Sequence, residues 1–187
     1  IDFPQVTFWG GIDYQVDSWY LRLFSVSRIF KWENEYIYVK HRPPTVVNRD
    51  GIDLRKINII SQKQSKKKKF MMLHYSLLFP CQVKEKCDYY ESVDWVSWGK
   101  TVDWGDNNYI RLNHPFRVHN VYNYVSWLNK YNGKHPQQII DMMKDIKNGY
   151  IKVELRDNTD ICRLLANPFY KIASFILIIF YNINKSM

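Results

Sequence analysis

The sequence contains little cysteine, glycine or histidine. Among 187 residues there are three Cys, seven Gly and five His. Cys81, Cys87 and Cys162 are an odd set without a CxxC pair. This pattern disfavours a disulfide scaffold and a zinc finger, and it favours a reducing compartment.

Motifs that bind phosphates or metals are absent as well. The chain has no GxxxxGK[ST] or GxGxxG loop and no HExxH spacing. His114 and His119 are five residues apart in a segment without a nearby acid. Asp13 and Asp17 could mimic a catalytic carboxylate pair, but capping of a helix explains them better. We therefore expect no enzyme, no metal and no cofactor.

Long hydrophobic runs are also missing. The apolar stretch around 175–180 is too short to span a bilayer, so we expect a buried helix or strand there and no membrane contact. Neither a signal peptide nor an Arg-rich presequence opens the chain. Because it begins with Ile1, we expect processing or an unusual start codon. The abundance of Ile, Tyr, Phe, Asn and Lys suits an AT-rich, organellar genome.

Positive charge, by contrast, is abundant and concentrated. Residues 40–79 hold ten Lys and Arg against Asp50 and Asp53, and so carry +8 of the chain's formal +9. Clustered Lys and Arg displace counterions from phosphates, which is typical of a polyanion-binding surface. The alternative is a solvated loop with a disordered lysine run. The predicted RNA-binding residues are Lys40, Arg42, Arg49, Arg55, Lys56, Lys63, Lys66, Lys67, Lys68 and Lys69.

The lysine run precedes apolar residues with helical spacing, from Phe70 to Leu78. With Ser65 as N-cap, the pattern predicts a helix over 65–79. Four lysines would then occupy its first turn, where the helix dipole disfavours positive charge. A bound phosphate would remove that conflict, which favours RNA binding over a solvated loop.

The first part of the chain predicts an α+β fold, a four-stranded sheet with two helices on one face. The expected elements begin with a strand at 3–9 ended by Gly10-Gly11 and a helix whose core residues are Trp19, Leu23, Phe24 and Phe30. Strands follow at 35–41, with Tyr36, Tyr38 and Lys40 on one face, and at 56–61, with a loop or hairpin tip at 45–55 between them. The helix at 65–79, an irregular connection at 81–106 with Trp95, Trp98 and Trp104, and a strand at 109–112 complete the domain. The order is strand, helix, strand, strand, helix, strand.

Residues 114–187 are expected to be a mostly helical extension of the domain formed by residues 1–113. Its expected elements are a helix through Val118, Val121, Tyr122, Val125 and Leu128, a second helix from Pro136 to Gly149, a strand at 150–155 and an apolar helix at 169–183. Apolar residues on these helices predict docking on other proteins.

Several short motifs follow one another at fixed spacing. They are Ile12 to Asp17, Pro43-Pro44-Thr45, Asn58 to Ser61, Lys66 to Phe70, His74 to Leu78 and Asn108 to Leu112. In this order they resemble the S-ten family of small-subunit ribosomal proteins over residues 1–113. Val46, Gln62, Lys63 and Ser76 depart from the family's pattern.

The resemblance implies a structural constituent of the small subunit of a mitochondrial ribosome. It implies that residues 40–69 bind rRNA of the subunit head, and that the sheet packs on S-three-like and S-fourteen-like neighbours rather than forming a free homo-oligomer. The alternative is an accessory, non-catalytic subunit of a mitochondrial respiratory complex, suggested by the aromatic richness and the apolar tail. The basic stretch would then face lipid headgroups or protein.

Overall fold

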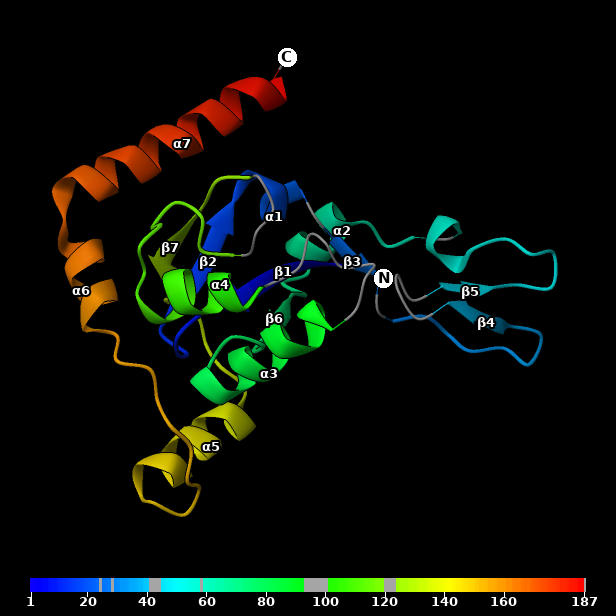
Figure 1. Ribbon diagram of the computed structural model, residues 1–187. Coiled ribbons are helices and arrows are strands. Elements are labelled where there is room, and N and C mark those ends of the chain that lie inside the picture. The colour runs from blue at the N-terminus through cyan, green and yellow to red at the C-terminus, as the bar shows by residue number, and fades with distance from the viewer. Residues whose placement is uncertain are drawn as a thin grey trace. The chain divides into compact units, whose positions relative to one another are not determined.

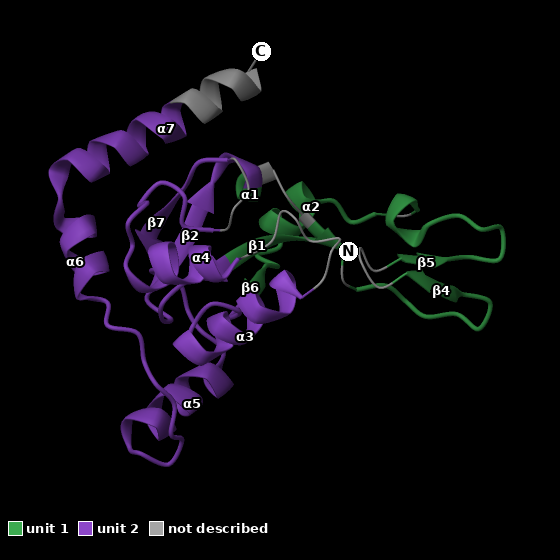
Figure 2. Cartoon of the chain, viewed as in Figure 1, with its two compact units in different colours: residues 1–6, 21–73 green, residues 7–20, 74–187 purple. Residues whose placement is uncertain are grey.

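A computed structural model describes residues 1–23, 25–27, 29–40, 45–57, 59–92, 101–119 and 124–186. The protein is a mixed α+β protein with a mostly antiparallel sheet and several helices (Figure 1). The α+β class agrees with the sequence prediction. The chain divides into two compact units (Figure 2). Unit 1 comprises residues 1–6 and 21–73, and unit 2 comprises residues 7–20 and 74–187.

Strand β1 (Asp2–Phe8) runs through both units, close to the predicted strand at 3–9. In unit 1 its first residues pair antiparallel with β3 (Ser25–Ser27). Gly10 has a φ of 69°, which only Gly adopts without cost, and it ends the strand as expected. The sheet order is β3-β1-β2-β7, and β6 (Met72–His74) also pairs with β1.

The predicted first helix is much shorter than expected. Helix α1 (Trp19–Leu23) has only five residues, and β3 begins at Ser25. Phe30, assigned by the pattern to this helix and to the core, is 46% exposed. Phe24 lies outside the described residues. Residues 25–27 form hydrogen bonds with β1 instead of extending α1. This pairing satisfies backbone N–H and C=O groups that a longer helix would have satisfied internally, so the strand forms despite the local helical spacing.

A hairpin in unit 1 carries the centre of the basic stretch. Strand β4 (Ile37–Lys40) pairs antiparallel with β5 (Thr45–Val47), and the single-turn helix η1 (Leu54–Lys56) follows. The expected turn at Asp50-Gly51 is confirmed, since Gly51 has a φ of 74° and the amide of Ile52 donates to the side chain of Asn48 at 2.8 Å.

The strand expected at 56–61 and the helix expected at 65–79 are both wrong. Helix α2 (Gln62–Lys67) begins earlier and ends before Phe70. The rest of the predicted helix contains the short strand β6 and otherwise forms turns and irregular structure. The reason is a capping box. The hydroxyl of Ser61 accepts from the amide of Gln64, and the side chain of Gln64 accepts from the amide of Ser61 at 2.8 Å. Asn58 lies outside the described residues.

In unit 2, strand β2 (Tyr14–Ser18) pairs antiparallel with both β1 and β7 (Ser126–Lys130). The helix predicted over 118–128 is therefore wrong at its C-terminal end, where Trp127 and Leu128 are fully buried strand residues. Val121 and Tyr122 lie outside the described residues. The partner strand β2 is more than a hundred residues earlier in the chain, so local spacing could not reveal the pairing.

Helices replace the irregular connection and the closing strand expected between 81 and 112. These elements are α3 (Pro80–Glu91), α4 (Val102–Trp104) and the π-helix η3 (Gly105–Ile110). Pro80 occupies the first turn of α3, where a missing amide proton costs nothing. Cys87 packs closely beside Gly105. A Cβ atom on residue 105 would lie 3.2 Å from the sulfur of Cys87. Trp95 and Trp98 lie outside the described residues.

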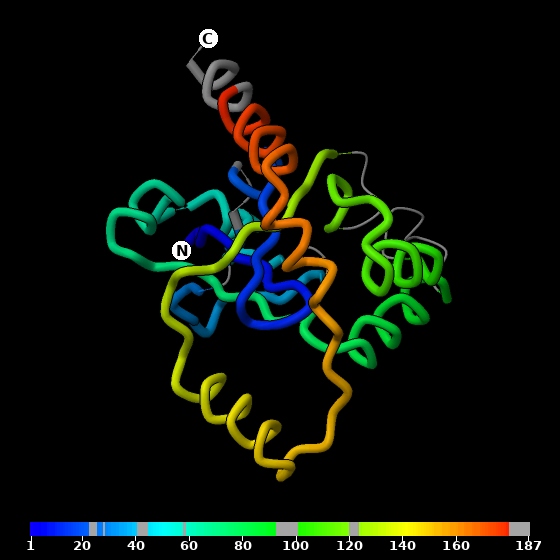
Figure 3. Tube along the Cα trace, turned by 90° about the vertical axis from the view of Figure 1, so that its left-hand side faces the viewer, coloured from blue at the N-terminus to red at the C-terminus, as the bar shows by residue number. Residues whose placement is uncertain are grey.

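The C-terminal helices are α5 (Gln137–Lys147), α6 (Thr159–Ala166) and α7 (Pro168–Ser186). The predicted helices at 136–149 and 169–183 are confirmed, and Gly149 follows α5 with a φ of 78°. The burial expected around 175–180 is wrong, because Phe175, Ile176 and Ile179 are 61%, 45% and 41% exposed. The strand expected at 150–155 is wrong, because residues 150–158 have no regular secondary structure between α5 and α6 (Figure 3). Within the described residues no single helix is long and apolar enough to cross a membrane, although α6 and the start of α7 pass that test together across a 73° bend.

The core of unit 2 joins both sides of the boundary expected at residue 113. Trp9, Tyr109, Val118 and Ile161 are fully buried. The indole nitrogen of Trp9 donates to the carbonyl of Val118 at 2.9 Å. The structure therefore divides the chain elsewhere than after residue 113, and residues 114–187 share a core with what precedes them.

Candidate nucleic-acid interface

Nearly all of the net charge lies in unit 1. This unit contains 13 Lys and Arg residues against five Asp and Glu residues, which leaves +8 of the formal +9. Unit 2 contains 14 Lys and Arg residues against 13 Asp and Glu residues, and is almost neutral. A polyanion would therefore be attracted to unit 1.

Eight of the ten predicted RNA-binding residues form what we call the basic surface. They are Lys40 in β4, Arg49 in the turn after β5, Lys56 in η1, Lys63, Lys66 and Lys67 in α2, and Lys68 and Lys69 directly after it, and all eight are exposed. Arg55 is only half-buried and paired, and Arg42 lies outside the described residues.

The lysine run ends a helix instead of beginning one. The amide of Phe70 donates to the carbonyl of Ser65 at 2.8 Å, and the amide of Lys69 donates to that of Lys66 at 3.0 Å. These two bonds form a Schellman motif, in which the residue after the cap adopts left-handed geometry. Here that residue is Lys69, with a φ of 59°.

This position reverses the expected electrostatics. The C-terminal end of a helix carries partial negative charge, so Lys66 and Lys67 in the last turn are stabilised by the dipole. The predicted conflict between the lysines and a helix start does not exist. The affinity of this run for phosphate therefore depends on the number and exposure of the lysines, and not on a strained helix terminus.

Arg55 serves the hairpin. Its Nε lies 3.0 Å from both carboxylate oxygens of Asp53, and its Nη2 lies 2.6 Å from one of them and 3.1 Å from the hydroxyl of Thr45. Hydrogen bonding to Arg55 lowers the pKa of Asp53, and the same bond raises the pKa of Arg55. Asp53 also caps η1 by accepting from the amide of Arg55 at 2.9 Å. Arg55 therefore fixes β5 against η1.

Arg49 has a weaker partner. Its Nη1 lies 3.5 Å from Glu35, and both side chains are more than 60% exposed. Exposed pairs of this kind contribute at most about 1 kcal/mol and weaken with salt. A phosphate could therefore replace Glu35 at little cost.

A groove beside the hairpin contains aromatic residues that the sequence did not identify as functional. It has a volume of about 540 Å³, and its lining includes Phe30, Trp32, Tyr36, Tyr38 and Arg55. Tyr36 and Tyr38 were expected on one face of a strand, whereas Phe30 was assigned to the core and Trp32 to no element. The signal that could have found them is the density of aromatic residues just before the basic stretch.

Candidate catalytic groups are tied into packing. The hydroxyl of Tyr75 lies 2.9 Å from Nδ1 of His135, and the ring of Tyr75 stacks on Phe8 at 4.5 Å. Burial raises the pKa of Tyr75. Asp17, expected to cap a helix, lies in β2 and accepts from the side chain of Asn129 at 3.1 Å. Among the described residues, no three His, Cys, Asp or Glu side chains are grouped to hold a metal.

Tyr14 and Cys162 are the nearest approach to a reactive pair. The tyrosine hydroxyl lies 3.2 Å from the sulfur, and this hydrogen bond, with burial, raises the pKa of Tyr14 to about 12. A phenol with such a pKa stays protonated at neutral pH and cannot act as a base. The contact joins β2 to α6.

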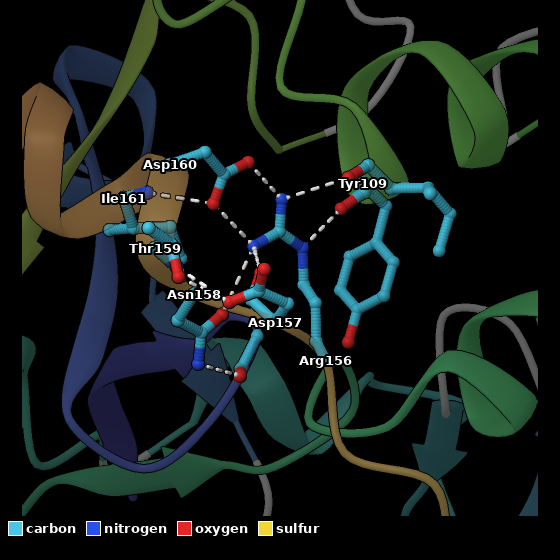
Figure 4. Close-up of polar contacts among 9 residues, drawn as sticks. Tyr109, Arg156, Asp157, Asn158, Thr159, Asp160 and Ile161 are labelled. Atoms are coloured by element: carbon cyan, nitrogen blue, oxygen red, sulfur yellow. Dashed lines mark hydrogen bonds and ion pairs between the residues drawn. The ribbon is translucent and has the colours of Figure 1, made fainter.

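Arg156 is the centre of a polar cluster in unit 2 (Figure 4). Its Nε donates to the carbonyl of Tyr109 at 2.5 Å, and Nη2 donates to the carbonyl of Ile110 at 3.1 Å and to Asp160 at 2.5 Å. Nη1 donates to the carbonyl of Asp157, to Asn158 and to Asp160.

The guanidinium also lies over the ring of Trp9, 4.8 Å from its centroid. Since Nε, Nη1 and Nη2 of Arg156 all have protein acceptors, the guanidinium has no donor to offer a substrate. Its role is to hold the extended segment after α5 against η3. Sequence reasoning assigned this arginine no role.

Comparison of the chain with protein families, with curated proteins and with solved structures finds no match.

Proposed function

We propose that this protein binds RNA through the basic surface of unit 1 and has no catalytic role. The observation that carries the proposal is the charge of unit 1, +8, with eight exposed Lys and Arg side chains along the hairpin, η1 and α2. Clustered cations of this kind bind the phosphate backbone and release its counterions. The near-neutral unit 2 offers no comparable attraction.

We further propose that the RNA is rRNA, in the small subunit of a mitochondrial ribosome. This step rests on the order of the S-ten-like motifs, and S-three-like and S-fourteen-like proteins would then be the neighbours. The strand-helix-strand-strand-helix-strand order of that family gives no additional support, because Lys66 to Phe70 lie at the end of α2 and not at the start of a helix.

An accessory role in a mitochondrial respiratory complex is the second candidate. It is favoured by α7, where Phe169, Ile172 and Phe175 are 79%, 57% and 61% exposed. These residues recur at helical spacing and form an apolar stripe that a larger assembly would cover. Isolation of the native particle distinguishes the two roles, since rRNA co-purifies only with the ribosome.

Binding to a labelled single-stranded RNA tests the first step. We expect the affinity to fall steeply with salt. Replacing Lys66, Lys67, Lys68 and Lys69 by Gln should weaken binding and reduce the salt slope by about 0.7 for each phosphate that is no longer neutralised.

The matched control removes four exposed lysines from unit 2, by Gln at Lys84, Lys144, Lys147 and Lys152. Lys144 and Lys147 occupy the last turn of α5, as Lys66 and Lys67 do in α2. The control should leave the slope unchanged, because these four lysines do not belong to the basic surface. Equal losses of affinity in the two variants would mean that only net charge matters, and the proposed surface would be wrong.

A further inference from the structure

The groove in unit 1 carries exposed aromatic rings close to one another. Trp32 is 55% exposed, Tyr38 54% and Phe30 46%. The ring centroids of Phe30 and Trp32 are 6.1 Å apart at an angle of 45°, and those of Trp32 and Tyr36 are 6.0 Å apart at 83°. The three rings are tilted or edge-on to each other, so none stacks flat on the next.

Exposure, and not tilt, distinguishes these rings from the core of unit 2. The rings of Trp9 and Tyr109 are also tilted, at 59°, but both residues are fully buried. Aromatic faces that are left open to water are costly, and a cluster of them marks a contact surface. A volume of about 540 Å³ is in the range of sites that hold small planar ligands.

The charges around the groove indicate which ligand it fits. Lys31 and Arg55 line it, and Lys40 follows Tyr38 by two residues in β4. Glu33 lies 3.6 Å from Lys31, Arg55 is paired with Asp53, and Asp2 accepts from the hydroxyl of Ser27, so the charges of the lining nearly cancel. The exposed Lys40 and the rest of the basic surface then supply the positive charge beside the groove. A flat apolar ligand that carries negative charge at its edge is thus favoured over an apolar peptide.

We propose that this groove holds an unpaired base of the bound RNA, stacked on Trp32 and Tyr38. Single-stranded RNA is recognised in this way, by aromatic side chains for the bases and cations for the flanking phosphates. The inference rests on the proposed RNA-binding function and deepens it. In this arrangement the basic surface binds the phosphates and the groove holds a base. Unit 1 would therefore prefer single strands or loops to a continuous duplex.

The test uses the full chain and a labelled 12-nucleotide single-stranded RNA. Trp32→Leu and Tyr38→Leu keep apolar bulk but remove the aromatic face. We expect each to weaken binding about tenfold, with the salt slope unchanged, because stacking does not involve counterion release. Tyr150→Leu is the matched control. It removes an exposed tyrosine, 81% exposed, from unit 2, and should leave the affinity unchanged.

A second measurement on the wild-type chain keeps the proposal testable if the variants fold poorly. The same strand with abasic sites, and the duplex form of the strand, should both bind more weakly than the intact single strand at equal salt. The groove assignment would be overturned if the abasic strand and the duplex bound as tightly as the intact single strand. It would also be overturned if folded leucine variants bound RNA as tightly as wild type does. Either result would favour a peptide as the occupant of the groove. A wild-type chain that binds no RNA would instead overturn the proposed function itself.

Discussion

The guanidinium of Arg156 and the carboxylate of Asp160 form an ion pair in which Nη2 lies 2.5 Å from Oδ2. The arginine side chain is 3% exposed and the aspartate 35%. Asp160 therefore keeps water on one side, while Arg156 depends on its protein acceptors. The pair links the start of α6 to the carbonyls of η3, and through Asn158, whose side chain donates to the carbonyl of Gly10 at 2.7 Å, to the end of β1.

Replacement of Arg156 by Met should lower the free energy of unfolding of unit 2 by about 3 kcal/mol or more. The carbonyls of Tyr109 and Ile110 lose their donors, and Asp160 loses its counter-charge. Urea unfolding followed by near-UV circular dichroism measures the decrease. Arg163→Met, at an exposed position of α6, should cost less than about 1 kcal/mol. Equal decreases would contradict the role assigned to the cluster.

Two buried tyrosines make a matched pair. The hydroxyl of Tyr170 accepts from the amide of Leu128 at 2.8 Å and lies 3.3 Å from its carbonyl. The hydroxyl of Tyr109 has no partner among the described residues. We expect Tyr170→Phe to destabilise the protein by about 1 kcal/mol, and Tyr109→Phe to be neutral or stabilising, since it removes an unsatisfied polar atom. Thermal melts of the two variants decide this, and a larger destabilisation by Tyr109→Phe would show the expectation to be wrong.

Stability should fall in alkali. Burial raises the pKa of Tyr170 to about 12 from its ordinary value of 10.0, and burial raises the pKa of Tyr109 as well. The unfolded chain then loses these protons at a lower pH than the folded chain. The contribution of the protonated tyrosines to the free energy of unfolding is fully present below pH 10 and is lost as the pH rises toward 12. Urea midpoints across this window should decline, and less steeply in Tyr170→Phe. A flat profile for wild type would exclude the mechanism.

Lys69→Gly should stabilise α2. The residue has a φ of 59°, which costs an L-residue about 1 kcal/mol and Gly almost nothing. Lys68→Gly is a control of equal charge, because Lys68 has a φ of −85°. It should destabilise by about 0.5–1 kcal/mol. Hydrogen exchange of the Phe70 amide, which closes the helix, measures both effects. Changes of the same sign and size in the two variants would contradict the left-handed geometry.

Sequence alone determined the features that depend on near neighbours. The concentration of positive charge between residues 40 and 69, the turn at Asp50-Gly51 and the helices near 137–147 and 168–186 could all be predicted. Each follows from composition, from backbone preferences of Gly, or from helical spacing over several turns. The α+β class followed from the mixture of these signals.

Tertiary structure decided the rest. Trp127 and Leu128 lie in a strand because β2 supplies hydrogen-bond partners from far away in the chain. The lysine run closes a helix because Ser61 and Gln64 set its start a full turn earlier than Ser65 would. Arg156 and the groove around Trp32 are assembled from segments that no local pattern connects. Local preferences amount to tenths of a kcal/mol per residue, whereas burial and strand pairing contribute several, so long-range contacts prevail wherever the two conflict.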